Sequence, residues 1–315
     1  MAATMYWTGS ASGLWTNVSN WVESDGTAPA AVPGTGDSVV FDGRVVAALT
    51  GSPASTIRLT KVQIKQTCPT SYYIGTALSP IAAAVDTFVV GEDDGLASSS
   101  AGCQKICWNF GATASGYSGS TVKILRTNTT GLDGLEVVQL QGTHSSNKIY
   151  LEGPCLVGLG TSFPGQAYTM SQVNVTGSGA RCNLGSGGTL TTIYQSDGSV
   201  ILNCALTTLT QISGVLRTEG TGAITTVNAG GIFISNSSGT ITTLSVTDTG
   251  FGDFSKTSVA RTVTTANVYG RGKLNANNGQ ALSVTFTNKP GALQGAVTSQ
   301  IEFGTGLYIQ QSATP

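Results

Sequence analysis

The chain has 315 residues, of which only 10 % are charged, and its formal net charge is −1. About 25 % charged residues is usual for a globular protein, so Ser, Thr, Asn, Gln and Gly replace charge here. Basic residues form no run of three and no stretch of about 20 apolar residues exists, which argues against binding nucleic acid or a membrane surface and against a spanning helix.

The first 120 residues are irregular in pattern and contain all four tryptophans, at positions 7, 15, 21 and 108. Runs of β-branched and aromatic residues predict strands at 39–41, 57–64 and 87–90, because such side chains pack well on a pleated sheet. The acidic stretch 92–94 is flanked by glycines but lacks the alternating ligands of calcium loops. A solvated turn is the favoured interpretation of that stretch, and a calcium site is the alternative.

A distinctive pattern occupies residues 7–43. It combines W-x-G at 7–9, Trp15, Asn20-Trp21, and P-x-x-G-D-x-V-x-F at 33–41. This pattern resembles the opening segment of bacterial β-solenoid surface proteins, of autotransporter-like passengers and of related phage virion proteins. The resemblance implies a fold and no activity. We expect Trp7, Trp15 and Trp21 to cap the open end of the core and Asp37 to fix a turn, the alternative being a tryptophan platform for sugar rings.

A second pattern, an apolar-Thr-Thr-apolar landmark, recurs in the second half of the chain. Its first apolar residue stands at positions 190, 206, 224, 241 and 263, and a glycine followed two residues later by an apolar residue comes after each copy. Recurrence at a nearly fixed spacing is the signature of a solenoid. The apolar positions expected to face the core are Leu190, Ile193, Leu206, Leu209, Ile224, Val227, Ile241, Leu244 and Val263.

The repeat predicts one coil of about 17 residues per copy. Parallel coils stack about 4.8 Å apart and bury their apolar positions against one another, while the glycines allow corners with a positive φ. The expected fold is therefore all-β: a single-stranded parallel, right-handed β-helix. We expect residues 1–119 to form a Trp-rich cap with irregular first coils, 120–288 the regular helix, and 289–315 a C-terminal cap or tail, because open sheet edges would recruit other chains.

Carboxylates within the repeat are few. Asp197 and Asp248 occupy the same place in coils that are three apart, or about 14 Å, which exceeds the roughly 5–9.5 Å between the two carboxylates of glycosidases. Asp197 is better interpreted as a turn residue before Gly198. Polar residues at 203, 219, 236 and 275 recur 12 or 13 residues after the landmark and predict a stacked ladder. We expect no catalytic residues and no enzymatic activity.

Six cysteines stand at positions 68, 103, 107, 155, 182 and 204, and the sole histidine is His144. The pair Cys103 and Cys107 has no Cys or His partner at zinc-site spacing, so buried or free thiols are favoured over a metal site. His144 lies in a Gly-Thr-His-Ser-Ser loop with no nucleophile nearby in sequence. We expect no metal and no cofactor.

These features favour a structural virion protein, such as a phage capsid decoration (cement) protein or a head fibre. The N-terminus has neither a basic region nor an apolar core, so a chain made in the host cytoplasm without a signal peptide is expected. The expected partners are other copies of the chain, as a homotrimer, and a major capsid protein lattice on the capsid exterior. The alternatives are a tailspike or receptor-binding protein with polysaccharide depolymerase activity, and a bacterial surface adhesin passenger.

Overall fold

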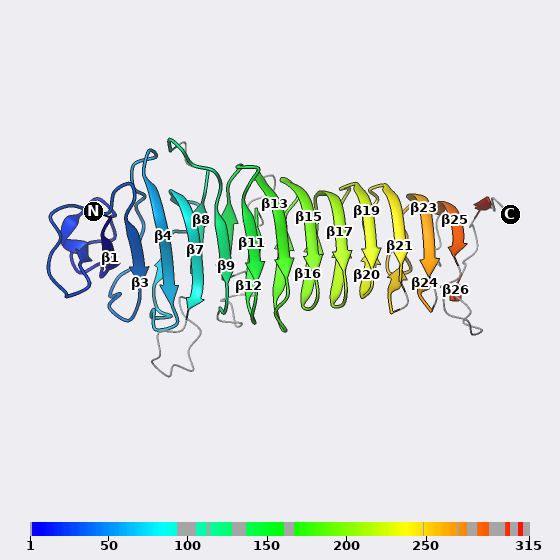
Figure 1. Ribbon diagram of the computed structural model, residues 1–315, viewed down its shortest axis with the longest axis horizontal. Coiled ribbons are helices and arrows are strands. Elements are labelled where there is room, and N and C mark those ends of the chain that lie inside the picture. Colours follow the sequence, from blue (N-terminus) through cyan, green and yellow to red (C-terminus); the bar gives the residue numbers. More distant parts are fainter. Residues whose placement is uncertain are drawn as a thin grey trace.

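Two long sheets dominate the chain, and both extend along the length of a rod (Figure 1). The computed structural model describes residues 2–92, 105–111, 114–127, 137–160, 167–247, 249–269 and 271–275, and the backbone of three further strands at 282–289, 300–302 and 308–310. The N-terminal segment lies at one end of the rod, and successive coils follow in sequence order toward the other end (Figure 1). The prediction of an all-β chain built on long parallel sheets is confirmed.

We call the 15-stranded sheet sheet A. Its strands follow one another along the rod in chain order, except that β2 stands at the outer edge beside β1. They are β1 (Thr4–Trp7), β2 (Trp21–Val22), β3 (Ser38–Phe41), β4 (Arg58–Lys65), β7 (Ala84–Glu92), β9 (Thr121–Ile124), β11 (Lys148–Leu151), β13 (Tyr168–Val175), β15 (Gly188–Gln195), β17 (Ala205–Gln211), β19 (Ile224–Ala229), β21 (Ile241–Val246), β23 (Arg261–Tyr269), β25 (Leu282–Lys289) and β27 (Tyr308–Gln310).

The 12-stranded sheet, which we call sheet B, alternates with sheet A along the chain. Its strands are β5 (Tyr73–Ile74), β6 (Ile81–Ala82), β8 (Lys105–Asn109), β10 (Val138–Gln141), β12 (Leu156–Leu159), β14 (Arg181–Leu184), β16 (Ser199–Leu202), β18 (Val215–Thr218), β20 (Ile232–Ser235), β22 (Phe251–Asp253), β24 (Lys273–Asn275) and β26 (Gln300–Glu302). Because each coil contributes one strand to each sheet from β8 onward, the two sheets advance together.

At the N-terminal end the chain departs from simple coiling. Strand β1 pairs in parallel with β3 and antiparallel with β2, which follows the short 3₁₀ helix η1 (Val18–Asn20). The β1–β2 pair is the one antiparallel pairing among the described strands. This hairpin-like turn places residues 4–22 at the outer edge of sheet A.

The landmark positions of the repeat are paired with one another across sheet A. Leu190 pairs with Leu206, and the series continues through Ile224 and Ile241 to Val263. Toward the N-terminus the paired positions lie further apart in sequence, as between residues 148 and 172 or 121 and 148. Parallel pairing fixes the register of the strands but not the length of the loops that connect them. The loops can therefore lengthen without disturbing the stack.

The repeat pattern also explains which side chains face the core. In β14 Arg181 and Asn183 point outward, while Cys182 and Leu184 are buried, as alternation requires. In β15 two threonines separate Leu190 from Ile193, yet both apolar residues are buried, and the pairing with β17 passes from Leu190 directly to Thr192. The nine apolar landmark residues are all 0–3 % exposed: Leu190, Ile193, Leu206, Leu209, Ile224, Val227, Ile241, Leu244 and Val263.

The corner glycines act in two different ways. Gly198 and Gly214 have φ of 73° and 84°, in the left-handed region that favours glycine, as predicted. Gly230, Gly252 and Gly272 have no positive φ, so the prediction is wrong at those three positions. A Cβ at Gly230 would stand 2.8 Å from the carbonyl oxygen of Gln211, and close packing against the neighbouring coil explains the glycine there.

Sheet pairing continues through both of the expected domain boundaries. Strand β7 pairs with β9 across residues 119 and 120, and β25 pairs with β27 beyond residue 289. The three expected segments thus share one continuous sheet A.

Candidate functional site

Three tryptophans pack together at the N-terminal end, in a cluster that we call the tryptophan cap. Trp7, Trp15 and Trp21 are 0–1 % exposed, and the Trp21 ring meets the other two edge-on, with centroids 5.0 Å from Trp7 and 4.7 Å from Trp15. The Nε1–H of Trp7 donates to the carbonyl of Ala47, and that of Trp21 donates to the carbonyl of Trp15. Since the rings are buried, they offer no platform to a sugar, and that alternative is wrong.

Two polar side chains hold the backbone around this cluster. Asp37 accepts from the backbone N–H of Ala3 at 2.7 Å and from that of Gly34 at 2.8 Å, so it ties the turn at 34–37 to the start of β1. The buried amide of Asn20 accepts from the N–H groups of Ala11 and Ser12 and donates to the Leu14 carbonyl. The sequence pattern contained Asn20, but its role in the loop became visible only with the fold.

The outward side chains of sheet A are polar along the regular region. In β15, β17, β19 and β21 they include exposed threonines and two half-buried rows that are paired across the strands, one of threonines only and one mixed: Thr192, Thr208, Thr226 and Thr243, and Tyr194, Thr210, Asn228 and Ser245. Seven of these eight carry a hydroxyl or an amide on a short side chain. The outer face of sheet A in this region is therefore polar, as expected for a surface in contact with water.

The corresponding side chains of sheet B have a different character. In β16, β18, β20 and β22 seven side chains point outward with at least part of their surface exposed, and five of them are large apolar residues, which we call the apolar stripe: Ile201, Val215, Ile232, Ile234 and Phe251. Ile232 is 41 % exposed, and the other four are half-buried. Val215, Ile232 and Phe251 are direct neighbours across three strands, so the stripe runs along the rod.

A polar ladder borders sheet B after the stripe. The amide of Asn236 donates to the Glu219 carboxylate at 3.3 Å, and Glu219 also pairs with Arg217 at 2.7 Å. Glu219 and Asn236 thus contact each other across adjacent coils. Asp197, at a corner, accepts from the N–H of Gly198 at 2.7 Å, whereas Asp248 lies outside the described residues.

The acidic stretch at 92–94 is described only at Glu92. Glu92 pairs with Lys65 at 2.9 Å and Lys61 at 3.9 Å and also accepts a hydrogen bond from Gln63, so its charge is balanced by its own sheet. Burial raises the pKa of Glu92, but the hydrogen bonds from Lys65 and Gln63 outweigh that effect and the net pKa is lowered. Asp93 and Asp94 lie outside the described residues.

His144 and Cys107 are engaged in local contacts. The His144 ring packs edge-on against Tyr117 at 5.1 Å, and its Nδ1 accepts from the N–H of Ser146. The buried thiol of Cys107 donates to the side chain of Gln139 at 3.3 Å, whereas Cys103 lies outside the described residues. Within the described ranges, no three His, Cys, Asp or Glu side chains come together as metal ligands would.

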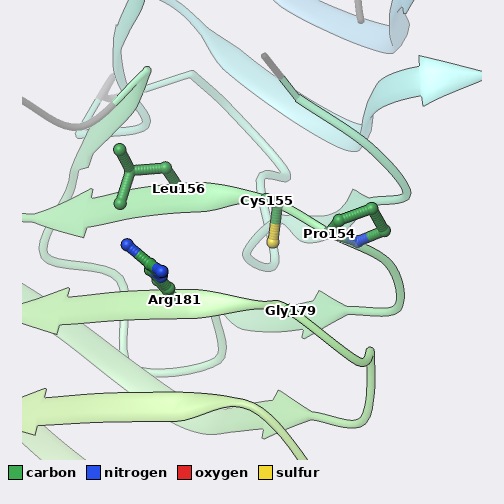
Figure 2. Close-up of a pocket in the computed structure, with 5 residues that line it drawn as sticks. All are labelled: Pro154, Cys155, Leu156, Gly179 and Arg181. Carbon is green, nitrogen blue, oxygen red and sulfur yellow. The ribbon is translucent and has the colours of Figure 1, made fainter. Parts of the chain in front are cut away.

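A small pocket of about 320 Å³ opens where β12 and β14 begin. Figure 2 shows the Cys155 thiol between Pro154 and Leu156, with Arg181 on the next strand. Burial raises the pKa of Cys155 to about 12, although a hydrogen bond from the Arg181 backbone opposes the rise. A thiol that stays protonated is a poor nucleophile. At neutral pH the pocket therefore provides a concave surface and one guanidinium group, but no reactive sulfur.

Buried thiols give the chain a specific pH dependence. Burial raises the pKa of Cys155 to about 12, and that of Cys107 and Cys204 to about 11. Because the folded-state values exceed the unfolded value of about 8.5, these thiols stabilise the fold fully below pH 8.5 and lose that contribution as pH rises toward 11–12. We expect the urea midpoint to be constant from pH 7 to 8 and to fall steadily between pH 9 and 11.

Replacing Cys155 with alanine should flatten this fall, because one of the raised pKa values is removed. The matched control is Ser213→Ala, an exposed corner residue, which should leave the slope unchanged. A urea midpoint that is independent of pH up to 11 in the parent chain would contradict the assignment.

Buried glutamines form a further polar feature that the landmark did not reveal. Gln195 and Gln211 are paired in sheet A and 0–3 % exposed, and the Gln211 amide donates to the Gln195 side chain at 3.1 Å. Each amide also donates to the carbonyl of a corner glycine and to one carbonyl of sheet B, which are Gly198 and Val215 for Gln195 and Gly214 and Ile232 for Gln211. The signal was present, because both stand five residues after the landmark apolar residue.

Comparison with known proteins gives no relative for the chain. No family model matches it, and neither a curated protein nor a solved structure matches it. Across the residues that the structure describes, no helix has the length and apolar character needed to cross a bilayer.

Proposed function

We propose that the chain is a structural virion protein, a capsid decoration or head-fibre protein that binds the outside of a capsid and stabilises it. The observation that carries the proposal is the uninterrupted rod, in which side chains such as Gln195, Gln211 and Asn236 are used to hold one coil to the next. Such a rod is suited to bridging fixed points on a lattice. Its fold would be a right-handed β-helix whose basic coil is about 17 residues.

The tryptophan cap is the proposed docking end. Around its buried rings the described loops expose three large apolar side chains, Leu14 at 52 %, Val18 at 38 % and Val46 at 54 %. Exposed apolar side chains at a rigid tip supply the contact area that a protein interface needs. The closed, hydrogen-bonded loop of Asn20 holds Leu14 in place, so docking would require little ordering of the chain.

The proposal is tested with capsids prepared with and without the protein. We expect decorated capsids to bind the chain stably through gel filtration and to resist heating to a higher temperature than bare capsids. Leu14→Asp should weaken binding, while Thr225→Asp, exposed on sheet A in the middle of the rod, should not. Equal heat stability of decorated and bare capsids would overturn cementing, and cleavage of host capsular polysaccharide by the purified chain would favour the tailspike alternative.

A further inference from the structure

The strands of sheet B differ from ordinary half-exposed strands in their sequence. Strand β20 reads Ile-Phe-Ile-Ser and β16 reads Ser-Val-Ile-Leu, so both faces of these strands are apolar. Parallel strands with apolar residues on both faces are typical of sheets covered on both sides. Inside, Phe233 is fully buried in the core, yet the outer face with Ile232 is open in the single chain. The outer face of sheet B is therefore suited to being covered over the strands from β16 to β22.

We propose that the apolar stripe is the contact through which copies of this chain associate, as parallel rods around an axis that runs along the stripe. The inference rests on the proposed function for the expectation of a trimer. It goes further by assigning the surface and the relative orientation of the copies. Val215, Ile232 and Phe251 of each copy would then lie nearest the axis.

Periodicity favours a second copy as the occupant. The stripe repeats once per strand, about every 4.8 Å along the rod, and side chains interdigitate over a long distance only with a surface of the same period. A parallel copy supplies that period over the whole of sheet B. With a net charge of −1 per chain, copies also meet little overall repulsion.

The charges that flank the stripe are complementary under rotation. Arg217, whose side chain also pairs with Glu219 of its own chain at 2.7 Å, follows the row of Val215, Ile232 and Phe251 on one side, whereas Asp197 lies at the corner on the other side, one strand away. Any rotation axis parallel to the rod brings one flank of a copy against the opposite flank of its neighbour. The guanidinium of each copy would thus approach the next copy's carboxylate.

The size of sheet B is compatible with a stable contact. Nine strands from β8 to β24 at about 4.8 Å spacing, each about 13 Å long, give a face of about 500 Å². With the corner residues on both sides, lengthwise packing approaches about 800 Å² per partner, the size of a standard protein interface. A contact limited to the stripe alone would be too small.

The test is sedimentation equilibrium of the full chain and of two variants. We expect the parent chain to sediment as three copies of 32.0 kDa and Ile232→Glu to sediment as one copy. The dissociation constant should rise at least about 100-fold, since a charge would be buried without a partner. Thr225→Glu, exposed on sheet A in the same coil, is the matched control and should remain a trimer.

A charge exchange tests the orientation. Arg217→Glu and Asp197→Arg should each weaken association about 10-fold, and the double variant should recover most of that loss. Glu219 pairs with Arg217 in the same chain, and this pair is lost equally in the Arg217→Glu variant and in the double variant. A gain in association from the single to the double variant therefore reports the contact between copies. Circular dichroism of each variant should match the parent chain.

Each other outcome has a definite meaning. A monomeric parent chain, or an Ile232→Glu variant that stays trimeric and folded, overturns the inference. A dimer that Ile232→Glu dissociates keeps the surface and overturns the three-fold symmetry. Capsid binding by a monomeric parent chain overturns this inference and leaves the proposed function standing, whereas a trimer that binds no capsid does the reverse.

Discussion

Replacing Trp21 with alanine is expected to lower the free energy of unfolding by about 3–5 kcal/mol, the usual cost of truncating a buried tryptophan. Trp21 is 1 % exposed and contacts both other tryptophans of the cap. Truncation would leave a cavity at the end of the core and remove the hydrogen bond to the Trp15 carbonyl. Urea unfolding followed by circular dichroism measures the loss.

Two further variants of the cap separate packing from surface effects. Trp21→Phe keeps much of the ring contact and should cost less than alanine, whereas Leu14→Ala, at a side chain that is 52 % exposed, should change stability by less than about 0.5 kcal/mol. We also expect Trp21→Ala to aggregate sooner on heating, because an opened end exposes strand edges. Equal urea midpoints for Trp21→Ala and Leu14→Ala would show that the cluster does not cap the core.

Replacing Arg261 with methionine is the second substitution with a large expected effect. Arg261 is 4 % exposed, and its guanidinium donates to the carbonyls of Ser237 at 3.3 Å, Phe254 at 2.7 Å and Thr257 at 3.0 Å. Burial lowers its pKa and nearby Asp253 raises it, but an arginine keeps its charge in proteins. Methionine would leave these carbonyls without their donors, and the buried Asp253 would lose a neighbouring positive charge.

We expect Arg261→Met to destabilise the chain by about 3–5 kcal/mol, as breaking a buried charged network usually does. The segment 254–260, which the guanidinium anchors at Phe254 and Thr257, should become susceptible to limited proteolysis. Lys273→Met removes a positive charge from an exposed position of sheet B and is the matched control. Unchanged stability and unchanged proteolysis in Arg261→Met would show that the network contributes little.

The landmark repeat could be predicted from the sequence because its residues have one physical role each. The apolar positions must face the core in every coil, so the same residue type returns at Leu190, Leu206 and Ile224, and the structure pairs these residues directly. The longer early coils could not be predicted, because a loop between parallel strands has no fixed length. The pattern at 7–43 located the cap, although the burial of its tryptophans follows from packing that the sequence does not contain.

The contacts of individual polar residues were the least predictable part. Arg261 is an isolated basic residue in the sequence, and nothing near it announces that Ser237, 24 residues earlier, would supply an acceptor. The apolar stripe had a readable signal, since Ile232-Phe233-Ile234 is apolar on both faces. The sequence of such a strand predicts its inner face by alternation, but it reads the same whether the outer apolar face is covered or open.

The direct pairing of Leu206 with Ile224 has a consequence for how such a rod can change in size. These residues are one coil apart, and their backbones occupy equivalent places in neighbouring strands of sheet A. Removing residues 206–223 would bring Ile224 into the place of Leu206, against Leu190, and shorten the rod by about 4.8 Å. The length of the rod can thus change in fixed steps through the gain or loss of single coils, while its two ends and its cross-section stay the same.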